Sequence, residues 1–139
     1  MKYLLDTNVI SELRKGSRCH PAVAAFFERL PSQDLCISVL TLGELRKGIE
    51  RIRGRDADQA QSLDAWLAEI SKHYASRIVP IDLEIAARWG RLAAIRTFPV
   101  IDGLLAATAL VHGLTLVTRN WRDLEGSGAA WLDPFEPRS

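Results

Sequence analysis

The chain has few cysteines and little net charge, and each scarcity excludes a class of protein. Its 139 residues include only two cysteines, Cys19 and Cys36, without C-x-x-C spacing. A disulfide framework is therefore excluded, and two small apolar fillers in a reducing cytoplasm are predicted. The formal net charge is +1, so any nucleic-acid partner must be held by a local basic patch rather than by overall charge.

Long apolar runs and several catalytic motifs are missing as well. The N-terminal run Tyr3–Leu5 is stopped by Asp6, far short of a signal-peptide core or a membrane span. We therefore expect a cytoplasmic protein that has no membrane partner. The three histidines lack metal-ligand spacing, and there is neither a G-x-S-x-G elbow nor a glycine-rich phosphate loop.

What the chain does contain is an alternation of short apolar runs and amphipathic stretches, in a length that fits one domain over residues 1–139. Strands are predicted at 3–5, 35–38, 78–81, 115–117 and, less clearly, 130–132. Helices are predicted at about 11–15, 21–30, 41–54, 58–75, 85–92 and 102–112. This order predicts an α/β fold whose mainly parallel, four- to five-stranded sheet is covered by helices on both faces.

Three carboxylates lie near the places where such a sheet would form its functional crevice, beyond the carboxyl ends of its strands. Asp6 directly follows the first strand, Glu44 lies early in the helix after the second strand, and Asp102 opens a buried helix. Each also has a structural interpretation. Asp6 can satisfy its own turn, Thr41 and Glu44 fit a T-x-x-E capping box, and Asp102 can be an N-cap. Judged alone, Glu44 is better explained by capping.

The segment after the fourth strand adds two further candidates, Asn120 and Asp123. Their structural interpretations are a turn residue and an exposed acid on a short helix. After the third strand, Asp82 and Glu84 form a competing acidic pair, which we interpret as the N-cap and first-turn acid of a helix.

The acids are more informative together than singly. Several carboxylates in one crevice repel one another and raise each other's pKa unless a cation is present. Oxygen ligands without a nearby histidine or cysteine select a hard cation, magnesium or manganese. Two such ions could activate a water molecule and stabilise the leaving oxygen of a phosphodiester.

Four segments resemble the PIN-domain nucleases and, more narrowly, the VapC/FitB-type toxins of bacterial toxin–antitoxin modules. They are Leu4–Leu13 (LLDTNVISEL), Ser38–Leu45 (SVLTLGEL), Ile101–Ala109 (IDGLLAATA) and Leu116–Asn120 (LVTRN). The match keeps the family's order and spacing and covers essentially the whole chain. The resemblance implies a PIN-like three-layer α/β/α domain, a metal-dependent endoribonuclease, a homodimer and a small cognate antitoxin that covers the active site.

The resemblance also assigns roles to individual residues. Asp6, Glu44 and Asp102 fall on the three acidic positions of the family's Mg²⁺ or Mn²⁺ site. The fourth position, often aspartate, falls at or near Asn120, so either Asn120 supplies a neutral oxygen or Asp123 supplies the charge one turn later. Thr7, Asn8 and Thr118 match polar positions that support the site.

Basic and aromatic residues suggest how RNA would be held. Arg46 and Lys47 could contact phosphates beside Glu44, although a solvated helix face explains them as well. A second basic patch lies near Asp6, and Arg14 is its main candidate. The remaining members of the two patches are Lys15, Arg18, Arg51, Arg53 and Arg55. Trp66 and Trp89 are expected in the core or at a dimer interface, and Trp121 could stack on a base.

Two other functions compete with the nuclease. A phosphoryl-accepting aspartate would need a second acid in a D-x-D pair, which Asn8 replaces, and a strand-end lysine that we do not find. The stronger alternative is a PIN-like module weakened by Asn120, which acts by binding an antitoxin or RNA.

Overall fold

The computed structural model describes residues 1–136, and a five-stranded parallel sheet forms its centre. The strand order is β3-β2-β1-β4-β5, and every neighbouring pair is parallel. The strands are β1 (Tyr3–Leu5), β2 (Leu35–Ser38), β3 (Ile78–Val79), β4 (Thr115–Val117) and β5 (Trp131–Leu132). The predicted parallel α/β sheet is confirmed. The third strand is shorter than predicted because it ends before Pro80, which has no N–H to donate to a neighbouring strand.

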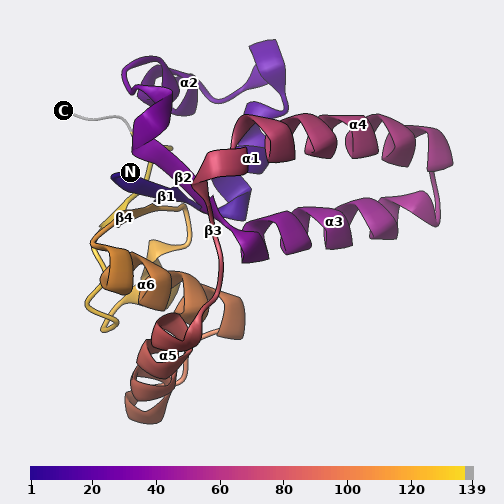
Figure 1. Ribbon diagram of the computed structural model, residues 1–139. Coiled ribbons are helices and arrows are strands. Elements are labelled where there is room, and N and C mark those ends of the chain that lie inside the picture. Colours follow the sequence, from indigo (N-terminus) through magenta and orange to yellow (C-terminus); the bar gives the residue numbers. More distant parts are fainter. Residues whose placement is uncertain (137–139) are drawn as a thin grey trace.

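Six α-helices cover the two faces of this sheet (Figure 1). They are α1 (Thr7–Leu13), α2 (Pro21–Glu28), α3 (Val39–Arg53), α4 (Ala57–His73), α5 (Leu83–Ile95) and α6 (Val100–His112). In β1, Leu5 packs with α1 to α4 and Leu4 packs with α5 and α6. Because successive side chains of a strand point to opposite faces, this alternation builds the three layers.

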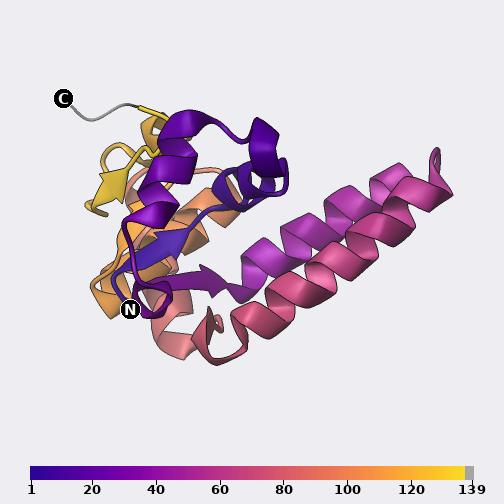
Figure 2. The same cartoon turned by 90° about the horizontal axis from the view of Figure 1, so that it is seen from above.

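Helices α3 and α4 form an antiparallel hairpin that extends away from the sheet (Figure 2). Charged side chains join its two arms. Asp64 of α4 accepts hydrogen bonds of 2.7 Å from both Arg46 and Arg53 of α3, and Glu50 pairs with the same two arginines. Within residues 1–136, no helix has both the length and the apolar composition needed to cross a membrane.

Two helix starts differ from the sequence prediction, and both differences concern the acids. Helix α1 begins at Thr7 rather than near Ser11, because Asp6 is its N-cap and accepts from the Thr7 N–H at 2.7 Å. Helix α6 begins at Val100, with Pro99 at the N-cap position. Asp102 is therefore a first-turn acid of α6 and not its N-cap.

The capping box predicted at Thr41 and Glu44 is wrong. Ser38 caps α3 instead, since its hydroxyl accepts from the Leu40 N–H at 3.0 Å. The helix therefore begins earlier than predicted, and Thr41 is fully buried inside it. Glu44 is released from capping and is available for another role.

Candidate active site

Asp6 is held at the carboxyl end of β1 by three neighbouring groups. Its Oδ1 caps α1, while its Oδ2 accepts from the Thr118 hydroxyl at 2.7 Å and from the Asn8 amide at 3.3 Å. The side chain is buried, being 5% exposed. Burial raises the pKa of Asp6 above its ordinary value, and the hydrogen bonds from Thr118, Thr7 and Asn8 oppose that rise. The structural and functional interpretations of Asp6 are thus compatible, because one oxygen caps while the other faces Thr118.

A small network fixes the chain after β4 against α1. The Thr118 hydroxyl accepts from the Asn120 backbone N–H at 2.9 Å, and Asn8 Oδ1 accepts from the Arg119 backbone N–H at 3.3 Å. Asn8 Nδ2 also approaches the Thr118 hydroxyl at 3.5 Å. Asn120 takes part through its backbone, whereas Asn8 and Thr118 contact the Asp6 carboxylate with their side chains.

Glu44 faces the same crevice from α3. The Thr7 hydroxyl, on the first residue of α1, donates to Glu44 Oε1 at 2.6 Å. Thr7 and Glu44 lie 37 residues apart in the sequence, so no local spacing predicts this contact. It ties the helix after β1 to the helix after β2 directly beside Asp6.

Asp102 lies near enough to the other acids for their charges to change its pKa. Burial, followed by the negative charges of Asp6, Asp123 and Glu44 in that order, raises the pKa of Asp102 to about 6. Asp123 comes from the short 3₁₀ turn η4 (Trp121–Leu124) after β4. Three carboxylates from three other segments therefore lie near enough to Asp102 for their charges to raise its pKa.

The acidic pair at the start of α5 has a different role. Asp82 is the N-cap of that helix and accepts from the Ile85 N–H at 2.9 Å, and Glu84 lies in its first turn. The structural interpretation of both residues is confirmed.

The donor chemistry of the four acids fits a hard divalent cation. In their positions here, no three His, Cys, Asp or Glu side chains of residues 1–136 lie close enough together to share a metal ion. The repulsion that raises the pKa of Asp102 nevertheless reaches it from three other carboxylates. A cation among oxygen ligands would relieve that repulsion, and carboxylate oxygens select magnesium or manganese.

A cavity of about 240 Å³ opens beside the acids, between α1 and the α3–α4 hairpin. Thr7 and Glu44 form part of its wall, and Arg14 and Trp66 line it as well. Arg14 is exposed there, and its contact with substrate stays a prediction. Arg46 is instead held by Glu50 and Asp64, so the structure does not support Arg46 as a phosphate ligand. Lys47 is exposed.

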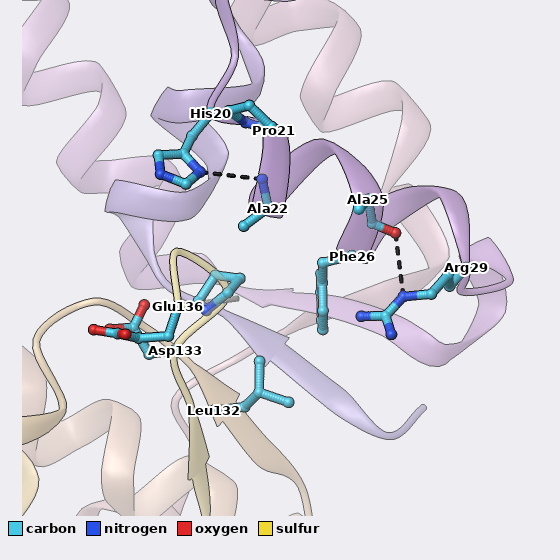
Figure 3. A pocket seen from close by; sticks show the side chains of 10 residues that line it. His20, Pro21, Ala22, Ala25, Phe26, Arg29, Leu132, Asp133 and Glu136 are labelled. Carbon is cyan, nitrogen blue, oxygen red and sulfur yellow. Dashed lines mark hydrogen bonds between the residues drawn. The ribbon is translucent and has the colours of Figure 1, made fainter. Parts of the chain in front are cut away.

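Two tryptophans of the helices are partly buried, and a second cavity lies away from the acids. Trp66 and Trp89 are partly buried against the two cores, as expected. A cavity of about 470 Å³ lies between α2 and the segment after β5 (Figure 3). None of the four acids lines it. Its walls are His20, Pro21, Ala22, Ala25, Phe26, Arg29, Leu132, Asp133, Pro134 and Glu136.

Comparison with known proteins relates this geometry to a family. The PIN domain model matches residues 3–125. The chain is 31% identical to the VapC ribonuclease Y4jK of Sinorhizobium fredii, over 96% of this chain and 98% of that protein. It is 30% identical to Toxin FitB of Neisseria gonorrhoeae, over 95% of this chain and 97% of that protein.

Solved structures agree. The crystal structure of FitAcB from Neisseria gonorrhoeae superimposes with a TM-score of 0.88 at 30% identity, over 97% of this chain and 99% of that one. The structure of FitAB bound to an IR36 DNA fragment gives a TM-score of 0.87 at 27% identity, over 99% of this chain and 98% of that one. The chain therefore belongs to the PIN domain family and, within it, to the VapC/FitB-type toxins.

Proposed function

We propose that this protein is a metal-dependent endoribonuclease and the toxin component of a toxin–antitoxin module. The observation that carries the proposal is that Thr7 joins Glu44 to the segment of Asp6 while the charges of Asp6, Asp123 and Glu44 all act on Asp102 and raise its pKa. The relative named a VapC ribonuclease supports the ribonuclease activity, and the relative named Toxin FitB supports the role as a toxin. The proposed substrate is RNA, and the proposed reaction is hydrolysis of a phosphodiester bond.

In this proposal Asp6, Asp102 and Glu44 hold Mg²⁺, with Mn²⁺ as a substitute. A bound ion would activate water and stabilise negative charge at the phosphate. The chain's own contribution is positioning. Thr118 and Asn8 fix Oδ2 of Asp6, and the Thr7 hydroxyl fixes Oε1 of Glu44, so the carboxylates are oriented before substrate binds.

We assign the fourth acidic position to Asp123 rather than to Asn120. The charge of Asp123 reaches Asp102 and raises its pKa. The contact of Asn120 with the site is a backbone hydrogen bond to Thr118. An asparagine at position 120 therefore does not remove the fourth charge. This argues for an active enzyme over a weakened module that only binds an antitoxin or RNA.

The proposed partners are a cognate antitoxin and a second copy of the chain. Two similar solved structures are those of FitAB bound to an IR36 DNA fragment and of FitAcB from Neisseria gonorrhoeae. An antitoxin that covers the crevice would keep the nuclease inactive. An RNA substrate is consistent with activity in the cytoplasm.

Cleavage of total cellular RNA by the purified, antitoxin-free protein tests the proposal. We expect discrete fragments with Mg²⁺ or Mn²⁺ and none with a chelator. Asp6→Asn is the matched inactive variant, because it keeps the size of the side chain and removes the charge. Cleavage that persists in Asp6→Asn or in chelator would refute the proposed mechanism. A folded, metal-binding protein that cleaves no RNA would favour the binding module instead.

A further inference from the structure

One threonine hydroxyl in the interior of the protein has no hydrogen-bond partner. Among the buried side-chain nitrogen and oxygen atoms of residues 1–136, Thr41 Oγ1 alone lacks a partner, and Thr41 is 0% exposed. A buried hydroxyl without a hydrogen bond costs free energy, so native proteins contain few of them. Where one is found, it commonly marks a bound water, an ion or a functional role.

Thr108, which is equally buried in α6, shows what a helical hydroxyl normally does. Its Oγ1 donates at 2.8 Å to the carbonyl of Leu104, four residues earlier in the same helix. Thr41 is the third residue of α3, so the residue four positions before it, Ile37, still belongs to β2. The start of α3 therefore provides no helical carbonyl at the position that would satisfy the Thr41 hydroxyl.

Helix geometry places Thr41 beside one of the candidate metal ligands. Its neighbours one turn later on the same face of α3 are Glu44 and Leu45, and both line the cavity of about 240 Å³. At this spacing the Cβ atoms of Thr41 and Glu44 are about 5–6 Å apart. Helical side chains lean towards the N-terminus of their helix, so the Glu44 side chain extends over the turn that contains Thr41. A rotation of side chains is therefore enough to bring the hydroxyl and the carboxylate together.

The Glu44 carboxylate can accept a second donor. Its Oε1 accepts from the Thr7 hydroxyl at 2.6 Å, and an ionised carboxylate has acceptor sites for several hydrogen bonds. With Glu44 placed as it is here, the Thr41 donor is unused. A buried donor next to a metal-binding carboxylate is suited to orient it, because hydrogen bonds to metal ligands fix their direction.

We propose that Thr41 is a positioning residue for Glu44, whose carboxylate accepts a hydrogen bond from the Thr41 hydroxyl when it holds a divalent cation. The inference rests on the proposed function, because it takes Glu44 to be a metal ligand. Thr7 of α1 and Thr41 of α3 would then hold the carboxylate from two different helices. The free energy spent on burying the Thr41 hydroxyl is offset in this arrangement by a better-oriented ligand.

The proposal predicts effects of opposite sign on stability and on metal affinity. Thr41→Val keeps the branched shape and removes the unpaired hydroxyl, so in chelator it should unfold at a higher urea concentration than the wild type. The same change should raise the Mg²⁺ concentration for half-maximal stabilisation roughly tenfold or more, because Glu44 loses a donor. Thr41→Ser restores the hydroxyl and should bind Mg²⁺ nearly as the wild type does. A merely structural residue would not combine a gain in stability with a loss of affinity.

Thr108→Val is the matched control, since Thr108 is equally buried and its hydroxyl is already bonded. It should unfold at a lower urea concentration than the wild type in chelator and need no more Mg²⁺. Urea unfolding of the full-length proteins over a Mg²⁺ titration measures both effects, and RNA cleavage is recorded on the same preparations.

The possible results separate this inference from the proposed function. If Mg²⁺ stabilises the wild type and Thr41→Val equally, the role of Thr41 is refuted while the proposed function stands. A Thr41→Val protein that is less stable than the wild type in chelator would refute it too, because the hydroxyl would then have a structural partner. If Mg²⁺ neither stabilises the wild type nor supports cleavage, the proposed function fails, and the role of Thr41 fails with it.

Discussion

The Thr7 hydroxyl donates a 2.6 Å hydrogen bond to Oε1 of Glu44, and this contact connects two of the segments that carry the acids. Thr7 immediately follows Asp6, whose carboxylate accepts from the Thr7 backbone N–H. One residue therefore contacts two acids, Asp6 through its backbone and Glu44 through its side chain. Thr7 therefore helps to set the distance between the Asp6 and Glu44 carboxylates.

Replacing Thr7 by valine removes the hydroxyl and keeps the branched shape. We expect activity, or the affinity for Mg²⁺, to fall roughly 10- to 100-fold, as for other groups that orient metal ligands. Thr7→Ser restores a hydroxyl and should recover most of the loss. RNA cleavage rates measured over a Mg²⁺ titration check the prediction. Equal rates for Thr7→Val and the wild type at every Mg²⁺ concentration would show that Glu44 does not need this donor.

The raised pKa of Asp102 predicts a pH dependence of stability in the metal-free protein. Its pKa is about 6 when folded, against an ordinary value of 3.8. Folding therefore favours the protonated form, so the penalty for the ionised form is complete above pH 6 and disappears below about pH 4. A shift of this size would be roughly 3 kcal/mol for a fully buried group, and about 1–2 kcal/mol after solvent screening of this half-buried one.

Asp102→Asn should accordingly be more stable than the wild type by that amount at pH 8 in chelator, and the difference should shrink as the pH falls towards 4. Urea unfolding at several pH values measures it. An Asp102→Asn protein no more stable than the wild type at pH 8 would mean that the charge of Asp102 is not penalised in the folded state. Added Mg²⁺ should stabilise only the wild type if Asp102 is a metal ligand.

The layered fold and three of the acids follow from the sequence, because both depend on local patterns. The apolar run Tyr3–Leu5 followed by Asp6 marks the end of a strand, and the apolar stretch after Asp102 marks a buried helix, although α1 and α6 both begin earlier than predicted. The Thr7–Glu44 contact and the stack of Trp121 on Trp131 join residues distant in the chain, and no periodicity encodes them. They become visible only when the strand order places their segments side by side.

The cap of α3 shows a different reason for failure. Thr41 and Glu44 have the spacing of a capping box, but Ser38 lies three residues earlier and has the same chemistry. Ser38, at the end of β2, is the cap that begins α3, so Thr41 lies buried within the helix. Residue type alone does not show which of two possible N-cap residues, Ser38 or Thr41, begins the helix. In this chain the answer decides whether the Glu44 side chain caps α3 or is available for another role.

Arg46 and Arg14 are predicted to differ in their effect on RNA cleavage. The Arg46 guanidinium is engaged by Asp64 and Glu50, whereas exposed Arg14 lines the cavity beside Glu44. Arg14→Gln should raise KM and weaken its salt dependence, because a phosphate contact is lost. Arg46→Gln should leave KM within about twofold of the wild type, since exposed ion pairs contribute little. Steady-state kinetics at two salt concentrations measure the KM of both variants. A larger rise in KM for Arg46→Gln than for Arg14→Gln would contradict the prediction that Arg14, and not Arg46, contacts a phosphate.

Gly103, next to Asp102 in the first turn of α6, is predicted to be intolerant of alanine. A Cβ there would lie 3.2 Å from the Trp89 ring of α5, tighter than an ordinary contact, and 3.4 Å from Cβ of Phe98, so the Trp89 ring or the start of α6 would have to shift by a few tenths of an ångström. The cost of such overpacking, about 1–3 kcal/mol, exceeds the gain of up to about 1 kcal/mol from replacing a helical glycine. Gly90→Ala in α5 is the matched control, since a Cβ at that position meets no atom within 4 Å and Gly90 does not line the cavity beside Glu44.

Gly90→Ala should therefore raise the melting temperature, and Gly103→Ala should lower it. Because Asp102 moves with the start of α6, Gly103→Ala should also reduce RNA cleavage in protein that is still folded, while Gly90→Ala changes chiefly stability. Thermal unfolding and cleavage rates measured on the same preparations test both statements. A Gly103→Ala protein as stable and as active as the wild type would show that the contact between α5 and α6 yields easily, and that the position of Asp102 does not depend on it.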